Sequence, residues 1–199
     1  FSPEDNGFDL KCQGLRTDRP LAISERELPG RTYAVEYTGT AKELFEVLLQ
    51  NDLFGYTVLK LFRNSIIRKF GLRFDTYVRL CEDELFVMQY FLHADRCMSV
   101  KNAGYFYYVP DWHAKYSRSD EEILYLFKRQ ADYCATLFSD DATAPVVRFF
   151  RDKYTNSLID SFARKPKPIY LGEIRRMHKD DYGCSRLFVP LKWLIVRDR

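Results

Sequence analysis

Apolar and polar positions along the chain follow two different periods, and these periods predict its elements. Apolar residues alternate with polar ones over residues 32–38, which predicts a strand that Gly39 ends. Elsewhere apolar residues recur at helical spacing. Two of these stretches begin with a capping box, in which a Ser or Thr caps the helix and a Glu reaches back. The predicted helices cover residues 40–50, 65–70, 82–94, 119–138, 143–163 and 171–179.

The helix predicted over residues 82–94 is apolar around nearly its whole circumference, which is typical of a buried helix. Its acidic start, Glu82-Asp83-Glu84, is therefore expected to point from the core outward. Such residues are common in a first helical turn simply because they suit the helix dipole. At most two of the three acids can share one site around the turn, and close like charges there would raise the pKa of one carboxyl and suit it to act as a base.

Strand signals follow this helix at residues 97–100 and 105–109, and Lys101-Asn102-Ala103-Gly104 separates them. We predict a hairpin or a strand pair there. Residues 1–30 are interpreted as polar and turn-rich. The chain therefore divides into an α/β part, residues 1–110, and a helical C-terminal extension, residues 111–199, which gives an α/β fold class.

Composition narrows the possible functions. Of the 199 residues, 46% are hydrophobic and 16% aromatic, which is ample for a core. The formal net charge is only +3, and acids accompany the bases, whereas a nucleic-acid binder usually carries a basic stripe. The five cysteines are widely spaced and form no CxxC pair, so reduced thiols and a cytoplasmic location are expected. Phe1-Ser2-Pro3 is interpreted as an internal start without a signal peptide.

An ordered set of motifs lies between residues 56 and 108. Lys60-Leu61-Phe62-Arg63 precedes a short helix, and Leu72-Arg73-Phe74-Asp75 follows it. Next come Glu82-Asp83 at the start of the buried helix, and then the tyrosine-rich Gly104-Tyr105-Phe106-Tyr107-Tyr108. This order resembles family 2 glycosyltransferases of the GT-A fold. The resemblance implies the acceptor-side half of an inverting enzyme, in which the catalytic base falls on Asp83 and Glu82 lies beside it.

The resemblance also suggests substrate contacts. Lys60 lies in an apolar run, and it is expected near the active site as a contact to the base or to the donor phosphates; an ordinary strand-edge lysine is the alternative. Trp112 and His113 are candidates for stacking on a sugar and for contacting a phosphate or metal, against an exposed loop as the alternative. Many relatives carry an aromatic residue and an asparagine where this chain has Val58 and Leu59.

The donor side of such an enzyme is not found in this sequence. A nucleotide-binding half and an Asp-x-Asp motif, which holds Mg²⁺ or Mn²⁺ against the diphosphate, precede this region in the family. We therefore expect no metal site in this chain, and no activity from it alone. The complete enzyme is expected to transfer a sugar from a nucleotide-sugar to a glycan or lipid-linked acceptor, in polysaccharide or glycoconjugate synthesis. The alternative is a non-catalytic glycan- or protein-binding module on the same scaffold.

The C-terminal residues 186–199 mix apolar side chains with Arg and Lys. One interpretation is peripheral contact with the inner face of a membrane, where lipid-linked acceptors reside. The other is a terminal element docked on the core. Both remain open from the sequence.

Overall fold

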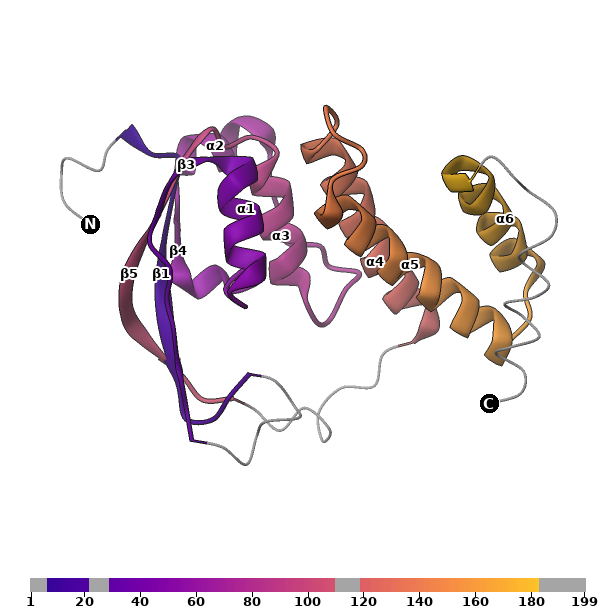
Figure 1. Ribbon diagram of the computed structural model, residues 1–199, viewed down its shortest axis with the longest axis horizontal. Helices are drawn as coiled ribbons and strands as arrows, with labels where there is room; N and C mark the ends of the chain where they lie inside the picture. The colour runs from indigo at the N-terminus through magenta and orange to yellow at the C-terminus, as the bar shows by residue number, and fades with distance from the viewer. Residues whose placement is uncertain (1–6, 22–28, 110–118, 183–199) are drawn as a thin grey trace.

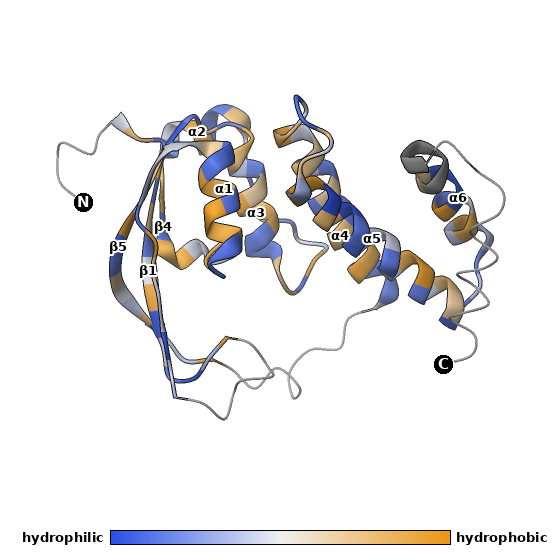
Figure 2. Cartoon of the chain, in the orientation of Figure 1, coloured by the Kyte–Doolittle hydropathy of each residue, from blue (hydrophilic) through white to orange (hydrophobic). Residues whose placement is uncertain are grey.

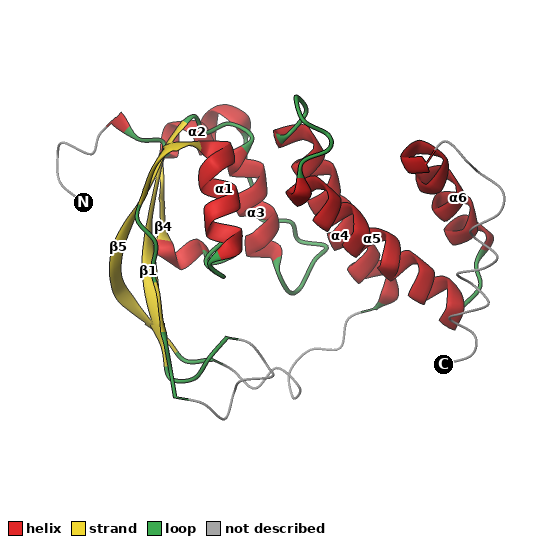
Figure 3. Ribbon diagram, in the orientation of Figure 1, coloured by secondary structure: helices red, strands yellow, loops and turns green. Residues whose placement is uncertain are grey.

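The computed structural model describes residues 7–21, 29–109 and 119–182, with the backbone alone for residues 178–182. Within these ranges the chain is a mixed α/β fold, which confirms the predicted fold class (Figures 1 and 3). The strands are β1 (Leu10–Thr17), β2 (Thr32–Tyr33), β3 (Tyr37–Thr40), β4 (Lys60–Phe62) and β5 (Arg96–Tyr107). The helices are α1 (Ala41–Gln50), the 3₁₀ turn η3 (Thr57–Leu59), α2 (Asn64–Phe70), α3 (Glu82–Phe91), α4 (Asp120–Leu137), α5 (Pro145–Arg164) and α6 (Pro168–Tyr182).

The described strands form one mixed sheet in the order β2-β1-β5-β3. β1 and β5 are parallel, and β3 is antiparallel to β5. The other edge of β1 is shared by β4 and β2, both antiparallel to it. The helices among the described residues lie to one side of this sheet, with α1 and α3 next to it and α4 and α5 beyond (Figure 1). The sheet therefore carries α3, and with it the acidic turn, on a single covered face.

Strand β1 corrects the interpretation of residues 1–30 as turn-rich. Its buried positions include Leu10, Cys12 and Leu15, and a shift of register separates the last two. Gly14 lies at that shift, where an added Cβ would lie 2.3 Å from the Tyr33 carbonyl oxygen. Only glycine allows this close approach of β2, and its presence interrupts the alternation that marks a strand.

The hairpin or strand pair predicted around residues 101–104 is also wrong, because β5 is a single strand. Gln13 pairs with Val100, yet Leu15 pairs with Tyr105, so β5 has extra residues over this stretch. The polar residues 101–104 form a bulge in a continuous strand rather than a turn between two strands. The strand predicted over residues 32–38 is instead divided into β2 and β3.

The helices agree more closely with the sequence. Thr40 caps α1 in the predicted capping box with Glu43, and Gly71 ends α2 in the left-handed conformation with φ 61°. At α4, the Ser119 side chain accepts a hydrogen bond from the Glu122 backbone N–H. The buried residues of α1 are 41, 44, 45 and 48, which is the spacing of one helix face, and Figure 2 shows hydrophobic and hydrophilic positions mixed along this helix. No helix in the described ranges is long and apolar enough to cross a bilayer.

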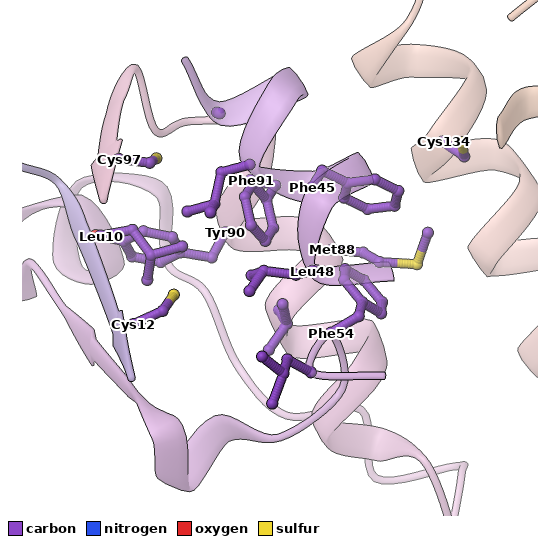
Figure 4. Close-up of a cluster of buried hydrophobic side chains, with 14 of the residues drawn as sticks. Leu10, Cys12, Phe45, Leu48, Phe54, Met88, Tyr90, Phe91, Cys97 and Cys134 are labelled. Carbon is purple, nitrogen blue, oxygen red and sulfur yellow. The ribbon is translucent and has the colours of Figure 1, made fainter. Parts of the chain in front are cut away.

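A continuous core joins the sheet side to the later helices, and Figure 4 shows part of it. The Phe45 ring of α1 contacts Phe54 and Phe91, with centroid distances of 4.6 and 5.4 Å. It also contacts Phe138 and Phe150, with centroid distances of 5.9 and 6.1 Å. The last two rings follow residue 110 in the chain. The core thus continues across the division predicted at residue 110, and the assignment of separate roles to the two parts stays a prediction.

Candidate active site

The acidic turn predicted from the sequence is the first turn of α3. Its N-cap, Cys81, is in the left-handed conformation with φ 67°, and its side chain makes no capping hydrogen bond. Asp83 supplies a local acceptor instead, because its Oδ1 accepts from the Glu84 backbone N–H at 2.9 Å. The rest of the helix is packed into the core, and its buried residues are Leu85, Phe86, Val87, Met88, Tyr90 and Phe91. A carboxylate on such a packed helix is held in a fixed position.

The Asp83 carboxyl is partly buried, and burial is the largest cause that raises its pKa to about 6 from its usual 3.8. The negative charges of Glu84 and, to a smaller extent, Glu82 raise it further. The hydrogen bond from the Glu84 N–H and the charge of Lys60 act in the opposite direction. A carboxyl with a pKa near neutrality is well matched to accepting a proton at physiological pH.

Lys60 lies in β4 and is only 6% exposed. Its Nζ donates to the carbonyl oxygens of Leu53 and Tyr56, each at 2.9 Å, so the lysine fastens the loop before η3 to the sheet. Burial lowers the pKa of Lys60 to about 8. Electrostatic interactions with Cys12, which pairs with Lys60 from strand β1, and with Asp83 raise it. A buried ammonium therefore lies within the electrostatic field of Asp83. The two hydrogen bonds give Lys60 a structural role in anchoring the loop, and its role as a substrate contact stays a prediction.

Two tyrosines that the sequence analysis did not single out also lie in the field of Asp83. The rings of Tyr56 and Tyr107 meet edge to face, with centroids 5.4 Å apart. Burial raises the pKa of both phenols, and the charge of Asp83 contributes to each. Both therefore keep their O–H groups, which are hydrogen-bond donors. The only signal in the sequence was the tyrosine-rich strand, whose alternation places Tyr107 on the same side as Tyr105.

The third acid of the turn, Glu84, is directed toward the later helices. Its Oε2 accepts a 2.5 Å hydrogen bond from Nε2 of Gln130 on α4. The Gln130 Oε1 in turn accepts from Lys153 Nζ on α5 at 3.2 Å. On the opposite side, an added Cβ at Gly55 would lie 2.6 Å from Glu84 Cγ. Glu84, the residue directly after Asp83, is thus held between the α1–η3 loop and α4.

Of the five residues singled out from the sequence, Glu82 and Lys60 act through their charges on the pKa of Asp83, in opposite directions. Trp112 and His113 lie outside the described residues. Val58 and Leu59 are the two positions at which the sequence departs from the family that it resembles; Val58 is 54% exposed, whereas Leu59 is buried.

The resemblance described above implies Mg²⁺ or Mn²⁺, and the His, Cys, Asp and Glu side chains of the described residues are the possible ligands. In this part of the chain no group of three or more His, Cys, Asp or Glu side chains is placed to hold a metal ion. The acidic turn alone does not supply such a ligand set, because Glu84 is engaged by Gln130. The residues described here therefore do not fit a metal site of their own.

Comparisons with known proteins give structural similarities but no match at the level of sequence. No protein-family model and no curated protein matches this sequence. Among solved structures, the chain is similar to residues 1–349 of TarS from S. aureus in complex with UDP-GlcNAc. The sequences are 13% identical, the TM-score is 0.44, and the match covers 89% of this chain and 49% of that one. The chain thus spans about half of the TarS structure, and a similarity at this level does not assign a function.

Proposed function

We propose that this chain supplies the general base of an inverting glycosyl transfer, and that the base is Asp83. The proposal rests chiefly on one observation: a partly buried carboxyl with its pKa raised to about 6, at the start of a buried helix and within the field of a buried lysine. Strongly perturbed carboxyls of this kind cluster at functional sites. The order of motifs around Glu82-Asp83 favours glycosyl transfer among the reactions that use such a base.

In the proposed step, the hydroxyl of a glycan or lipid-linked acceptor attacks the anomeric carbon of a nucleotide-sugar. Its O–H bond breaks as the new C–O bond forms, and the proton passes to a carboxylate oxygen of Asp83. The bond from the anomeric carbon to the diphosphate breaks, and the nucleoside diphosphate leaves with that electron pair. General-base assistance of this kind contributes roughly 10²–10⁴-fold to the rate.

The neighbouring residues adjust this base. Lys60 opposes the rise in the pKa of Asp83, so that the carboxyl remains largely ionised near neutral pH. The Glu84 N–H holds one carboxylate oxygen at 2.9 Å, which leaves Oδ2 as the oxygen that we assign to the acceptor proton. Tyr56 and Tyr107, whose pKa values the charge of Asp83 helps to raise, keep their phenolic protons. Donor binding and any Mg²⁺ or Mn²⁺ belong, in this proposal, to sequence outside these 199 residues.

The test uses the polypeptide as encoded, with any sequence that flanks these residues. Purified protein is given a panel of nucleotide-sugars that includes UDP-GlcNAc, and release of nucleoside diphosphate is followed together with product mass. We expect Asp83→Asn to lower kcat by roughly 10²–10⁴-fold with little change in the KM for the donor. Asp160→Asn, an exposed position on α5, is the matched control for the loss of one charge.

Retention of turnover by Asp83→Asn would remove Asp83 from the role of base. The other outcome concerns the alternative function. Oligosaccharide binding that Asp83→Asn leaves unchanged, with no consumption of any donor, would instead establish a non-catalytic binding module.

A further inference from the structure

Gln130 connects the acidic turn of α3 to the helical extension. Its side chain is fully buried, at 0% exposure. The amide nitrogen donates to Glu84 Oε2 at 2.5 Å, and the amide oxygen accepts from Lys153 Nζ at 3.2 Å. A buried amide with a carboxylate at one end and an ammonium at the other has only one favourable orientation, because reversing it would turn both contacts into repulsions.

This arrangement fixes Glu84 from two sides. Gly55 allows the Glu84 side chain to lie against the loop, since a Cβ at that position would meet Glu84 Cγ at 2.6 Å. Gln130 then holds the carboxylate end. Glu84 is the residue directly after Asp83, and its charge is the largest of the charge effects that raise the pKa of Asp83. The position of Glu84 therefore matters to the neighbouring carboxyl.

We propose that Gln130 is a positioning residue for the Asp83 site: its amide fixes the Glu84 carboxylate beside Asp83, so that α4 and α5 take part in the reaction centre. This inference rests on the proposed function, in which Asp83 takes up a proton. Lys153 acts one step further away, because it fixes the orientation of the amide. The helical extension then helps to determine the pH at which Asp83 is ionised, in addition to covering the core.

The other groups that influence Asp83 do not depend on α4. The Glu82 charge comes from the same turn, and Lys60 comes from β4. Gln130→Met leaves both of these residues unchanged, so the proposal requires the effect of Gln130 on Asp83 to pass through Glu84.

A double-mutant cycle on this chain tests that requirement. The four proteins are the wild type, Gln130→Met, Glu84→Gln and the double variant; methionine keeps the length of glutamine without its hydrogen bonds. The pKa of Asp83 is measured in each by ¹³C NMR titration of the side-chain carboxyl. We expect Gln130→Met to lower the pKa of Asp83 by roughly 1 relative to wild type, because Glu84 is released. In the Glu84→Gln background, Gln130→Met should leave the pKa of Asp83 unchanged.

Two results would overturn the proposal: an unchanged pKa of Asp83 in Gln130→Met, or an equal change in both backgrounds. Thermal unfolding by circular dichroism checks that each variant folds. If Gln130→Met does not fold, Lys153→Met replaces it in the same cycle, with a smaller expected shift in the same direction and the same two contrary results.

A kinetic readout separates this proposal from the proposed function. In the encoded enzyme, Gln130→Met should move the acidic limb of the kcat/KM profile to lower pH. If the NMR cycle gives the expected coupling but Asp83→Asn keeps its turnover, the positioning role stands and the general-base role fails. If Asp83→Asn abolishes turnover but the cycle shows no coupling, the general-base role stands and the positioning role of Gln130 fails.

Discussion

Replacing Asp83 with asparagine should stabilise the folded chain at neutral and higher pH. The pKa of this carboxyl is raised in the folded state, so folding favours its protonated form. Between the unfolded and folded pKa values the folded state binds more protons, and the stability of the wild type therefore falls as the pH rises through this range. At pH values above the folded pKa, the ionised carboxylate destabilises the folded state by an amount that no longer changes with pH. Asparagine removes the charge, and its Oδ1 can still accept from the Glu84 N–H.

The magnitude follows from the pKa values. The rise from 3.8 to about 6 corresponds to at most about 3 kcal/mol, since a pKa difference of 1 is worth about 1.4 kcal/mol. Asp83 is only partly buried, and the variant also loses the attraction to Lys60, so solvent screening and that loss reduce the gain. We expect Asp83→Asn to raise the free energy of unfolding by about 1–2 kcal/mol above pH 7, and the gain to shrink as the pH falls from about 6 to about 4 and to vanish below that range.

Urea unfolding followed by circular dichroism measures this difference at several pH values. The exposed Asp160→Asn variant again serves as the control, and it should show no comparable dependence on pH. A gain that is the same at about pH 4 and pH 8, or a loss of stability at pH 8, would refute the reasoning. Either result would mean that Asp83 is not a strained carboxylate in the folded state.

Three further substitutions test other parts of the structure. Lys60→Met should raise the pKa of Asp83, because it removes the charge that lowers this pKa, and ¹³C NMR titration measures the change. Thr40→Ala should cost about 1 kcal/mol of stability in urea unfolding, since it removes the cap of α1. Tyr90→Phe should cost about 1–3 kcal/mol by the same assay, because the hydroxyl accepts from Arg63 N–H at 2.8 Å and donates to the Asp9 carbonyl at 2.6 Å. No loss of stability in either of the last two variants would contradict the hydrogen bonds assigned to it.

The helices could be predicted from the sequence because their signals are local. A cap such as Thr40 and a stop such as Gly71 act within one turn of the helix they define. The predictions of strands were wrong where the structure of a segment depends on a partner strand that is distant in the sequence. Gly14 interrupts β1 because β2 approaches it, and the polar residues 101–104 stay in β5 because β1 pairs on both sides of them.

The same distinction applies to the candidate site. Asp83 and Lys60 were identified within one ordered run of motifs, and the structure brings their charges into mutual influence. Gln130 was not identified, because nothing in the sequence near α4 indicates a carboxylate that lies 46 residues earlier in the chain. Tyr107 was seen only as part of a tyrosine-rich strand, since its approach to Tyr56 depends on how β5 and the loop before η3 are packed.

The Phe45 ring has a further consequence for how binding would be detected. Its contacts join α1 to Phe91 of α3 and to Phe138 and Phe150 near the ends of α4 and α5 that face it. Segments that share one well-packed core tend to unfold in a single cooperative transition. A ligand that binds only the folded chain, whether near Asp83 or on the later helices, then raises the midpoint of that same transition. A thermal-shift screen of the whole chain would therefore report occupants of both regions through one signal.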